Sequence, residues 1–418
     1  MIRICPTVFS GKIKAPASKA HAQRLLFMGA MPAEPTIIKN VPECDDIDTA
    51  VDVLRTLGST IDIRKNEYTV HPFPKTSPMP SVTLNFKESA TTARMSIALC
   101  GAFGMKADCR ASGTLPKRKM IQITGRMAIR GVTFSSFSLP FIQEGRLLGG
   151  DYIFSGDEGS QSISSLMMFL PCLLQDSTIT FSSPLIDRSY IDITRKALES
   201  FKITMENKDD GYFIPGKQYY QSPGEISTEN DWSLASMWIT AAAACGPKAP
   251  GLTVTDLPKD SPQIYRDLSA FLALIQQDFK DINIDASKIP NLTTLLCALA
   301  IVKGATVRIS GVPQLRFKEA DRLRAMGNIA NALGQAALVT SGGITIMGTG
   351  KPEYREDTVV DCQGDPWIFM SMALAAATMK KPLILDNEHG AEKIYRNFLK
   401  DYESVGGKYE IIKKENRF

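Results

Sequence analysis

A segment of small and apolar residues recurs along the 418-residue chain, and it limits the fold more than any other feature. Each copy is ten or more residues long and apolar around most of its circumference, which predicts a buried helix. Short β-branched stretches such as 177–183, 251–257 and 305–312 follow most copies and predict strands. The copies begin near Lys19, Ala90, Ser160, Asp231, Asn291 and Asp365, at intervals of 71, 70, 71, 60 and 74 residues.

A second recurring segment alternates with the first and has the amphipathic pattern of a half-exposed helix. Gly58, Gly131, Gly334 and Gly406 follow its last apolar turn, as expected for glycine just beyond a helix end. Both series shorten between the fourth and fifth copies, which chance spacing in a generic α/β chain does not explain. The copies of the second segment begin near Asp46, Lys119, Tyr190, Gln263, Glu319 and Glu392, at intervals of 73, 71, 73, 56 and 73 residues.

Together the two recurring segments predict a repeated unit with two helices, one buried and one half-exposed, and strands between them. Three units precede the polar, turn-rich stretch 221–224, and three follow it. The length of the chain also favours two domains. We therefore predict an α/β fold with two similar domains, one over residues 18–228 and a discontinuous one over 1–17 and 229–418.

Composition excludes several classes of protein. The net charge of +4 is small, and Lys and Arg are spread along the chain, which argues against a nucleic-acid-binding surface. The three histidines lack metal-binding spacing, and the eight cysteines form no CxxC pair, so we expect no metal and reduced thiols. The first residues do not resemble a signal peptide, and the longest apolar stretches are shorter than the roughly 18 to 20 residues that span a bilayer. We expect a cytoplasmic protein that binds neither nucleic acid nor membranes.

The starts of the buried helices carry polar residues, among them Lys19, Ser89, Ser160 and Asp365. Helices that start at equivalent points of their units tend to present their first turns on a common side. Free N–H groups and the positive end of the helix dipole attract anions there. We therefore predict an anion-binding surface on each domain.

Several motifs stand at these helix starts, and each alone is compatible with an ordinary solvated helix end. They are PASKAHAQR (16–24), ESATTAR (88–94), GSQS (159–162), SYIDIT (189–194) and RFKEADRL (316–323). Together and in this order, they resemble the enolpyruvyl transferase family in its 5-enolpyruvylshikimate-3-phosphate synthase branch, over essentially the whole chain. The sister branch that acts on UDP-N-acetylglucosamine typically has a Lys-Asn pair where this chain has Lys19 and Ala20.

The resemblance implies a fold and a reaction. The fold has two domains of three βαβαββ-type units, with ligands in the interdomain cleft. The reaction transfers the enolpyruvyl group of phosphoenolpyruvate to the 5-hydroxyl of shikimate 3-phosphate and releases phosphate, on the pathway to chorismate and aromatic amino acids. It implies no cofactor, and we expect a monomer.

The resemblance also implies roles for matched residues. Lys19, Glu319 and Asn291 occupy catalytic positions, with Lys19 near the reacting hydroxyl and Glu319 as proton donor and acceptor. Asp231 matches an acid that orients other groups. Shikimate 3-phosphate is implied to contact Lys19, Arg24, Ser160, Gln161, Tyr190 and Lys318, and phosphoenolpyruvate to contact Ala90, Arg118, Gln161, Arg322 and Lys393.

Some positions depart from the family pattern. Asn291 stands where the family has an Asp that is thought to accept the hydroxyl proton, and an amide cannot act as that base. Trp367 stands where the family has an arginine that binds phosphoenolpyruvate. Ala20, Gly159 and Asp187 stand where the shikimate-phosphate site has serines. Two alternatives therefore stay open: a catalytically impaired binding protein, or transfer to another acceptor such as UDP-N-acetylglucosamine.

Ala90 leads to a first prediction, because the phosphoenolpyruvate loop of the family commonly has glycine there, and the pattern of this chain resembles the glyphosate-tolerant branch. The extra methyl narrows the space beside the ligand. We expect weak inhibition by glyphosate in a phosphate-release assay, and stronger inhibition of an Ala90→Gly variant. Potent competitive inhibition of the wild-type chain at low concentration would contradict this expectation.

Overall fold

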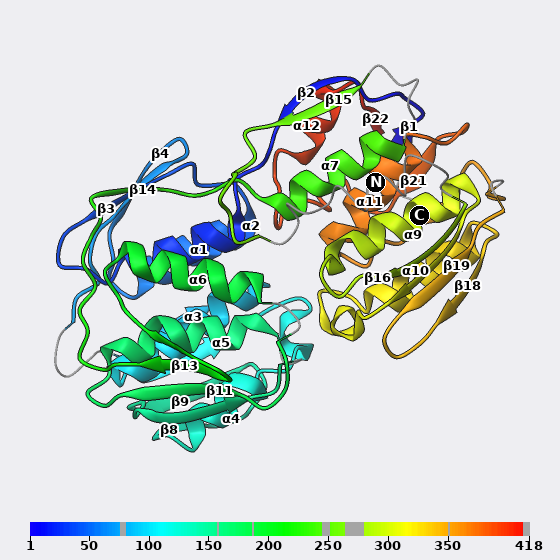
Figure 1. Ribbon diagram of the computed structural model, residues 1–418. Helices are drawn as coiled ribbons and strands as arrows, with labels where there is room; N and C mark the ends of the chain where they lie inside the picture. The colour runs from blue at the N-terminus through cyan, green and yellow to red at the C-terminus, as the bar shows by residue number, and fades with distance from the viewer. Residues whose placement is uncertain are drawn as a thin grey trace, which may run out of the picture. The chain divides into compact units, whose positions relative to one another are not determined.

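The computed structural model describes residues 1–75, 81–156, 159–185, 188–244, 251–263, 280–349 and 352–412. Its chain divides into two compact units (Figure 1). Unit 1 comprises Met1–Pro16 and Asn230–Phe418, and unit 2 comprises Ala17–Glu229. Each unit has its own apolar core.

One strand pattern recurs in the sheets. In the sheet β6-β7-β9-β8, strands β6 and β7 are parallel, whereas β9 is antiparallel to both β7 and β8. A helix links β6 to β7, because a parallel pair requires a crossover connection, and a second helix links β7 to β8. The order is therefore β-α-β-α-β-β, and the sheets β10-β11-β13-β12 and β16-β17-β19-β18 repeat it. The predicted α/β class and repeated unit are confirmed.

Two of the remaining sheets have the same four-stranded pattern but use strands from distant parts of the chain. In β14-β3-β5-β4 the parallel partner of β3 comes from the end of unit 2. In β20-β21-β1-β22 the first strand of the chain lies between β21 and β22. Strand β2 pairs in parallel with β15. Unit 1 is discontinuous because its sheets need β1 and β2.

The strand bounds are as follows. Unit 2 contains β3 (Thr36–Lys39), β4 (Ile61–Arg64), β5 (Glu67–Val70), β6 (Val82–Asn85), β7 (Ala107–Arg110), β8 (Val132–Phe134), β9 (Phe141–Gly145), β10 (Gly150–Phe154), β11 (Ser177–Phe181), β12 (Glu206–Lys208), β13 (Gly211–Ile214) and β14 (Glu225–Ser227). Unit 1 contains β1 (Ile2–Cys5), β2 (Gly11–Lys14), β15 (Leu252–Thr255), β16 (Asp281–Asp285), β17 (Thr306–Ser310), β18 (Ala336–Val339), β19 (Ile344–Met347), β20 (Val359–Val360), β21 (Leu383–Leu385) and β22 (Lys408–Ile411).

The buried helices begin within two residues of their predicted starts. They are α1 (Lys19–Gly29), α3 (Ala90–Phe103), α5 (Ser160–Phe169), α7 (Trp232–Ala244), α9 (Thr293–Lys303) and α11 (Pro366–Ala376). Every residue of α11 is buried, so this helix is covered by other elements on all sides. Figure 1 shows the helices of unit 2 packed against one another, with the sheets outside them.

The amphipathic helices agree less closely with the sequence. They are α2 (Asp45–Thr56), α4 (Ile121–Ala128), α6 (Ser189–Ser200), α10 (Arg322–Ala332) and α12 (Phe398–Ser404). The expected start near Glu392 is wrong, because residues 391–397 form turns and α12 begins six residues later. The start near Glu319 is also wrong, because Asp321 caps α10 by accepting from the Arg324 N–H. The helix predicted from Gln263 lies outside the described residues, apart from Gln263 itself.

Two further expectations concern the glycines after helices and the cysteines. The four glycines predicted to follow helices all have positive φ, between 72° and 97°. The described cysteines are free thiols; Cys245 lies outside the described residues. None of the described helices is long and apolar enough to cross a membrane.

His21 joins α1 to the end of its own unit. Its Nδ1 accepts a hydrogen bond from the Glu229 backbone N–H at 3.1 Å, and Nδ1 must be unprotonated to do so. Burial, followed by the nearby charges of Arg24 and Lys196, lowers the pKa of His21 to about 3.

This lowered pKa predicts acid sensitivity. The unfolded chain binds the His21 proton first as the pH falls, because the folded pKa lies below the ordinary value of 6.5. The contribution of His21 to the free energy of unfolding is complete above that value and declines by up to about 1.4 kcal/mol per pH unit toward the folded pKa. Urea unfolding at about pH 7, 6 and 5 should show a shallower decline for His21→Gln than for the wild type. His71→Gln is the control, and equal slopes for His21→Gln and the wild type would contradict the assignment.

Candidate active site

Three buried helices of unit 2 are joined by hydrogen bonds in their first two turns. Gln23 on α1 donates to Ser89 Oγ at 3.2 Å and to Thr92 Oγ1 at 3.0 Å, at the start of α3. Gln161 on α5 accepts from Arg94 Nη1 on α3 at 3.1 Å. The starts of α1, α3 and α5 therefore lie together, as the sequence predicted for this domain.

The residues that precede these helices leave their first turns open. Ser18, Ser89 and Gly159 are the N-cap residues, and none of them makes a side-chain capping bond. The first N–H groups of an uncapped helix, together with its dipole, favour an anion. The geometry of unit 2 is therefore suited to an anionic ligand.

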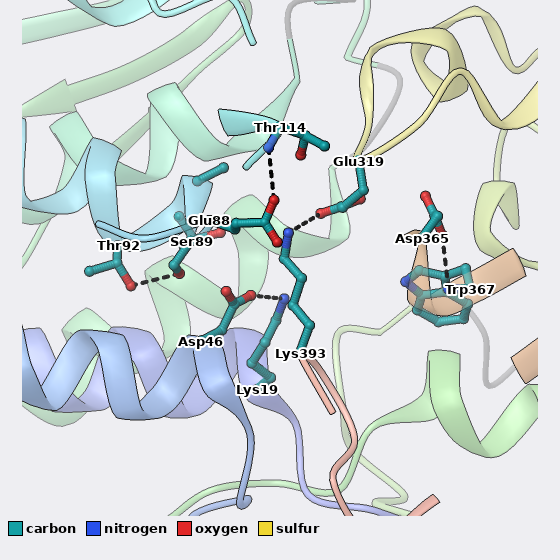
Figure 2. Close-up of polar contacts among 12 residues, drawn as sticks. Lys19, Asp46, Glu88, Ser89, Thr92, Thr114, Glu319, Asp365, Trp367 and Lys393 are labelled. Carbon is teal, nitrogen blue, oxygen red and sulfur yellow. Dashed lines mark hydrogen bonds and ion pairs between the residues drawn. The ribbon is translucent and has the colours of Figure 1, made fainter. Parts of the chain in front are cut away.

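Lys19 forms an ion pair at the start of α1. Its Nζ lies 2.7 Å from Asp46 Oδ2, and the Asp46 side chain is only 7% exposed (Figure 2). Removing one partner of a buried ion pair leaves the other charge uncompensated. Asp46 therefore orients Lys19. The sequence analysis named Asp46 as the start of an amphipathic helix but not as a partner of Lys19.

Arg24 has internal partners. Its Nε donates to Thr194 Oγ1 at 2.6 Å, Nη1 to the Ala20 carbonyl at 2.6 Å, and Nη2 to Ser164 Oγ at 3.0 Å. A weaker bond of 3.3 Å reaches the Tyr190 carbonyl. The guanidinium joins α1, α5 and α6, so Arg24 positions the helix starts. Its direct contact with a substrate stays a prediction.

Arg94 and Arg118 place two cations beside the start of α3. Arg94 is buried, and its hydrogen-bond acceptors are neutral: the carbonyls of Ala90 and Lys119 and the Gln161 amide oxygen, at 3.0–3.1 Å. Burial and the charge of Arg118 lower the pKa of Arg94 to about 9. An anion between these groups would relieve both effects. The ESATTAR motif contains Arg94, but the sequence analysis assigned it no role.

Arg322 is the centre of the unit 1 site. Its Nε lies 2.7 Å from Asp365 Oδ2, its Nη2 lies 3.0 Å from Glu319 Oε2, and its Nη1 lies 3.2 Å from Asn291 Oδ1. The side chains of Arg322 and Asp365 are 3% and 0% exposed. Three segments distant in sequence thus converge on one guanidinium.

Asp365 has a second structural role. Its Oδ1 accepts the backbone N–H groups of Trp367 and Ile368, at 2.9 and 3.3 Å, and thereby caps α11. One carboxylate therefore fixes both the helix start and Arg322. The sequence analysis recognised Asp365 as a helix start but not as a partner of Arg322.

Glu319 lies between two cations of unit 1. Its Oε2 faces Arg322, and its Oε1 lies 3.6 Å from Lys393 Nζ (Figure 2). Lys393 comes from the turn that precedes α12, whereas Glu319 precedes α10. The two cations hold this carboxylate in place.

The structure places the other matched residues less decisively. Ser160, Gln161 and Tyr190 stand in the first turns of α5 and α6, and Lys318 is half-buried after the 3-10 helix Pro313–Phe317. Asp231 accepts from the Leu234 N–H at 2.9 Å and so opens α7. Asp187 lies outside the described residues. No group of His, Cys, Asp or Glu side chains within the described ranges is arranged to hold a metal.

A model of the family described as EPSP synthase (3-phosphoshikimate 1-carboxyvinyltransferase) matches residues 5–402. The chain belongs to the EPSP synthase family. This confirms the resemblance drawn from the helix-start motifs and shows that the chain is a transferase of the enolpyruvyl-transfer class. The match extends over both units and is not limited to one motif.

Relatives and solved structures of this family are distant in sequence. The 3-phosphoshikimate 1-carboxyvinyltransferase of Clostridium novyi is 27% identical over 430 residues, covering 97% of each chain. The protein of the same name from Saccharolobus solfataricus is 28% identical, covering 98% of this chain and all of that one. EPSP synthase from Acinetobacter baumannii superposes with a TM-score of 0.78 at 18% identity, covering 99% of each chain. The enolpyruvyl transferase NikO from Streptomyces tendae gives 0.71 at 14% identity, over 98% of each. The two structures confirm the fold.

Glu88 pins the loop that leads to Arg118 in this EPSP synthase family member. Its Oε1 accepts the Thr114 backbone N–H at 2.7 Å (Figure 2). Gly113 has a φ of +59°, and a Cβ there would lie 1.7 Å from Glu88 Oε1. The close approach requires glycine, so Glu88 and Gly113 together fix the loop on the start of α3.

Loss of this contact should weaken the binding of phosphoenolpyruvate. We expect Glu88→Ala to raise the KM for phosphoenolpyruvate about tenfold, because a hydrogen bond to a charged group is worth about 1.5 to 3 kcal/mol. Glu88→Gln keeps an acceptor oxygen and is the matched control, with a much smaller change. Gly113→Ala should mimic Glu88→Ala and add little to it. Equal effects of the Ala and Gln variants at position 88 would contradict the positioning role.

Proposed function

We propose that this chain transfers the enolpyruvyl group of phosphoenolpyruvate to the 5-hydroxyl of shikimate 3-phosphate and releases phosphate. The family match supports the reaction class. The observation that carries the residue assignment is Glu319, a carboxylate held between Arg322 and Lys393. We further propose that the enzyme works as a cytoplasmic monomer.

The reaction moves one proton in each of its steps. In the addition, the hydroxyl oxygen bonds to C2 of the enol and loses its proton, while C3 gains a proton. In the elimination, C3 loses a proton and the C2–O bond to phosphate breaks. Acid–base groups positioned in this way typically contribute rate factors of about 10² to 10⁴.

We assign the proton transfers to Glu319. As a carboxylate it takes the hydroxyl proton, and as a carboxylic acid it delivers that proton to C3. In the elimination it takes a proton back from C3 and passes it to the departing phosphate, which restores the carboxylate. Lys393 Nζ lies 3.6 Å from Glu319 Oε1 and helps to position this carboxylate.

Asn291 is assigned a positioning role instead of a basic one. Its Oδ1 accepts from Arg322 Nη1 at 3.2 Å, and a neutral amide has no basic site at ordinary pH. This assignment replaces the family expectation of a carboxylate base at that position. A single carboxylate at Glu319 then does the work that two would share.

We assign anion binding to the cations of both units. Lys19, held by Asp46, and the pair Arg94 and Arg118 are the contribution of unit 2. Arg322 is the contribution of unit 1, together with Lys393. Guanidinium groups suit carboxylate and phosphate because they can bind two oxygens at once.

The absence of a carboxylate at Asn291 supports a second candidate function, in which the chain binds the same ligands without turnover. Calorimetry with shikimate 3-phosphate and a phosphate-release assay separate the two candidates. Binding without release would favour the binding protein. Release only with UDP-N-acetylglucosamine as acceptor would favour the altered-acceptor alternative.

The proposed role of Glu319 gives a direct test. We expect Glu319→Gln to lower kcat by about 10² to 10⁴ while shikimate 3-phosphate still binds, because the amide fills the same space but transfers no proton. Glu356→Gln changes an exposed carboxylate of the same unit and is the control. Phosphate release at the wild-type rate by Glu319→Gln would rule out the assignment.

A further inference from the structure

Two uncharged side chains stand against the buried guanidinium of Arg322. Asn291 accepts from Nη1 at 3.2 Å. The ring of Trp367 lies on α11, with its centroid 5.9 Å from Arg322 Cζ, which is within range of a cation–π contact. Both residues come from starts of buried helices, one at α9 and one at α11.

Four charged side chains of the described residues are joined by ion pairs at this point. We call Arg322, Lys393, Glu319 and Asp365 the Arg322 cluster, because Glu319 contacts both cations and Asp365 contacts Arg322. The cluster carries two formal positive and two formal negative charges. Its side chains are between 0% and 14% exposed, so solvent screens an added charge only weakly.

We propose that Asn291 and Trp367 form a specificity-determining pair that keeps the Arg322 cluster neutral, so that it accepts one carboxylate or phosphate group of phosphoenolpyruvate. This inference rests on the proposed function for its ligand. It assigns the two residues a joint role: either can be charged only if the other takes the opposite charge.

The physical reason is the cost of a buried surplus charge. Asn291→Asp adds a third carboxylate against Arg322, which opposes the arrival of an anionic ligand. Trp367→Arg adds a second guanidinium beside Arg322 and removes the ring that stacks on it. In the double variant the new aspartate and the new arginine compensate each other around Arg322.

The test is a double-mutant cycle with two measurements. In urea unfolding, we expect each single variant to lower the folding equilibrium constant about tenfold or more. The factor by which the folding equilibrium constant falls in the double variant should be at least tenfold smaller than the product of the factors for the two single variants. In steady-state kinetics, Asn291→Asp should raise the KM for phosphoenolpyruvate about tenfold, and the double variant should return within about threefold of the wild type. The KM for shikimate 3-phosphate should change less than about twofold.

Matched controls add the same charges to exposed strands of the same unit. Asn283→Asp on β16 and Leu338→Arg on β18 lie at exposed positions, and we expect no coupling between them. Additive unfolding effects at 291 and 367 would overturn the proposal. An Asn291→Asp variant that behaves like Asn283→Asp, or an equal change in both KM values, would also overturn it.

The two measurements separate this inference from the proposed function. If the wild-type chain shows no phosphate release, the proposed function fails. The unfolding cycle needs no turnover and still decides whether Asn291 and Trp367 are coupled through Arg322.

Discussion

Burial of one helix in each repeat is the constraint on which the rest of this structure depends. A helix such as α11, buried at every residue, cannot be covered by the single sheet of its own repeat. It needs neighbouring repeats on its other sides, which explains why the repeats gather into units with helices inside and sheets outside. The helix starts then lie together as a consequence of packing.

The same packing takes polar groups into the interior. Gln23, Arg24 and Arg94 are all buried, and each is bonded to oxygens from another helix. A buried polar group without a partner costs roughly 1 to 3 kcal/mol, so these cross-helix bonds hold the helix starts in register. The candidate site is therefore built on helix starts whose relative positions are fixed by these cross-helix bonds.

The two units differ in the groups that surround their buried arginines. In unit 2, buried Arg94 has neutral acceptors and a cationic neighbour, so its charge favours an anion. In unit 1, Arg322 is already balanced by Asp365 and Glu319. The carboxylate of Glu319 thus lies between two cations, Arg322 and Lys393, whereas Arg94 and Arg118 place two cations near the start of α3 in unit 2. This division agrees with the roles proposed for catalysis and for anion binding.

The sequence by itself determined the repeat, because a buried helix must be apolar on all sides and its period is visible in composition alone. It also placed Lys19 at the start of a buried helix, and the resemblance to the family named Glu319, Arg322 and Lys393 as further candidates. The tertiary structure alone decided the partners. Asp46 and Asp365 are distant in sequence from Lys19 and Arg322, and no local pattern reveals a contact made through packing. For the same reason only the structure showed that Arg24 is bonded to side chains of other helices and that α12 begins at Phe398.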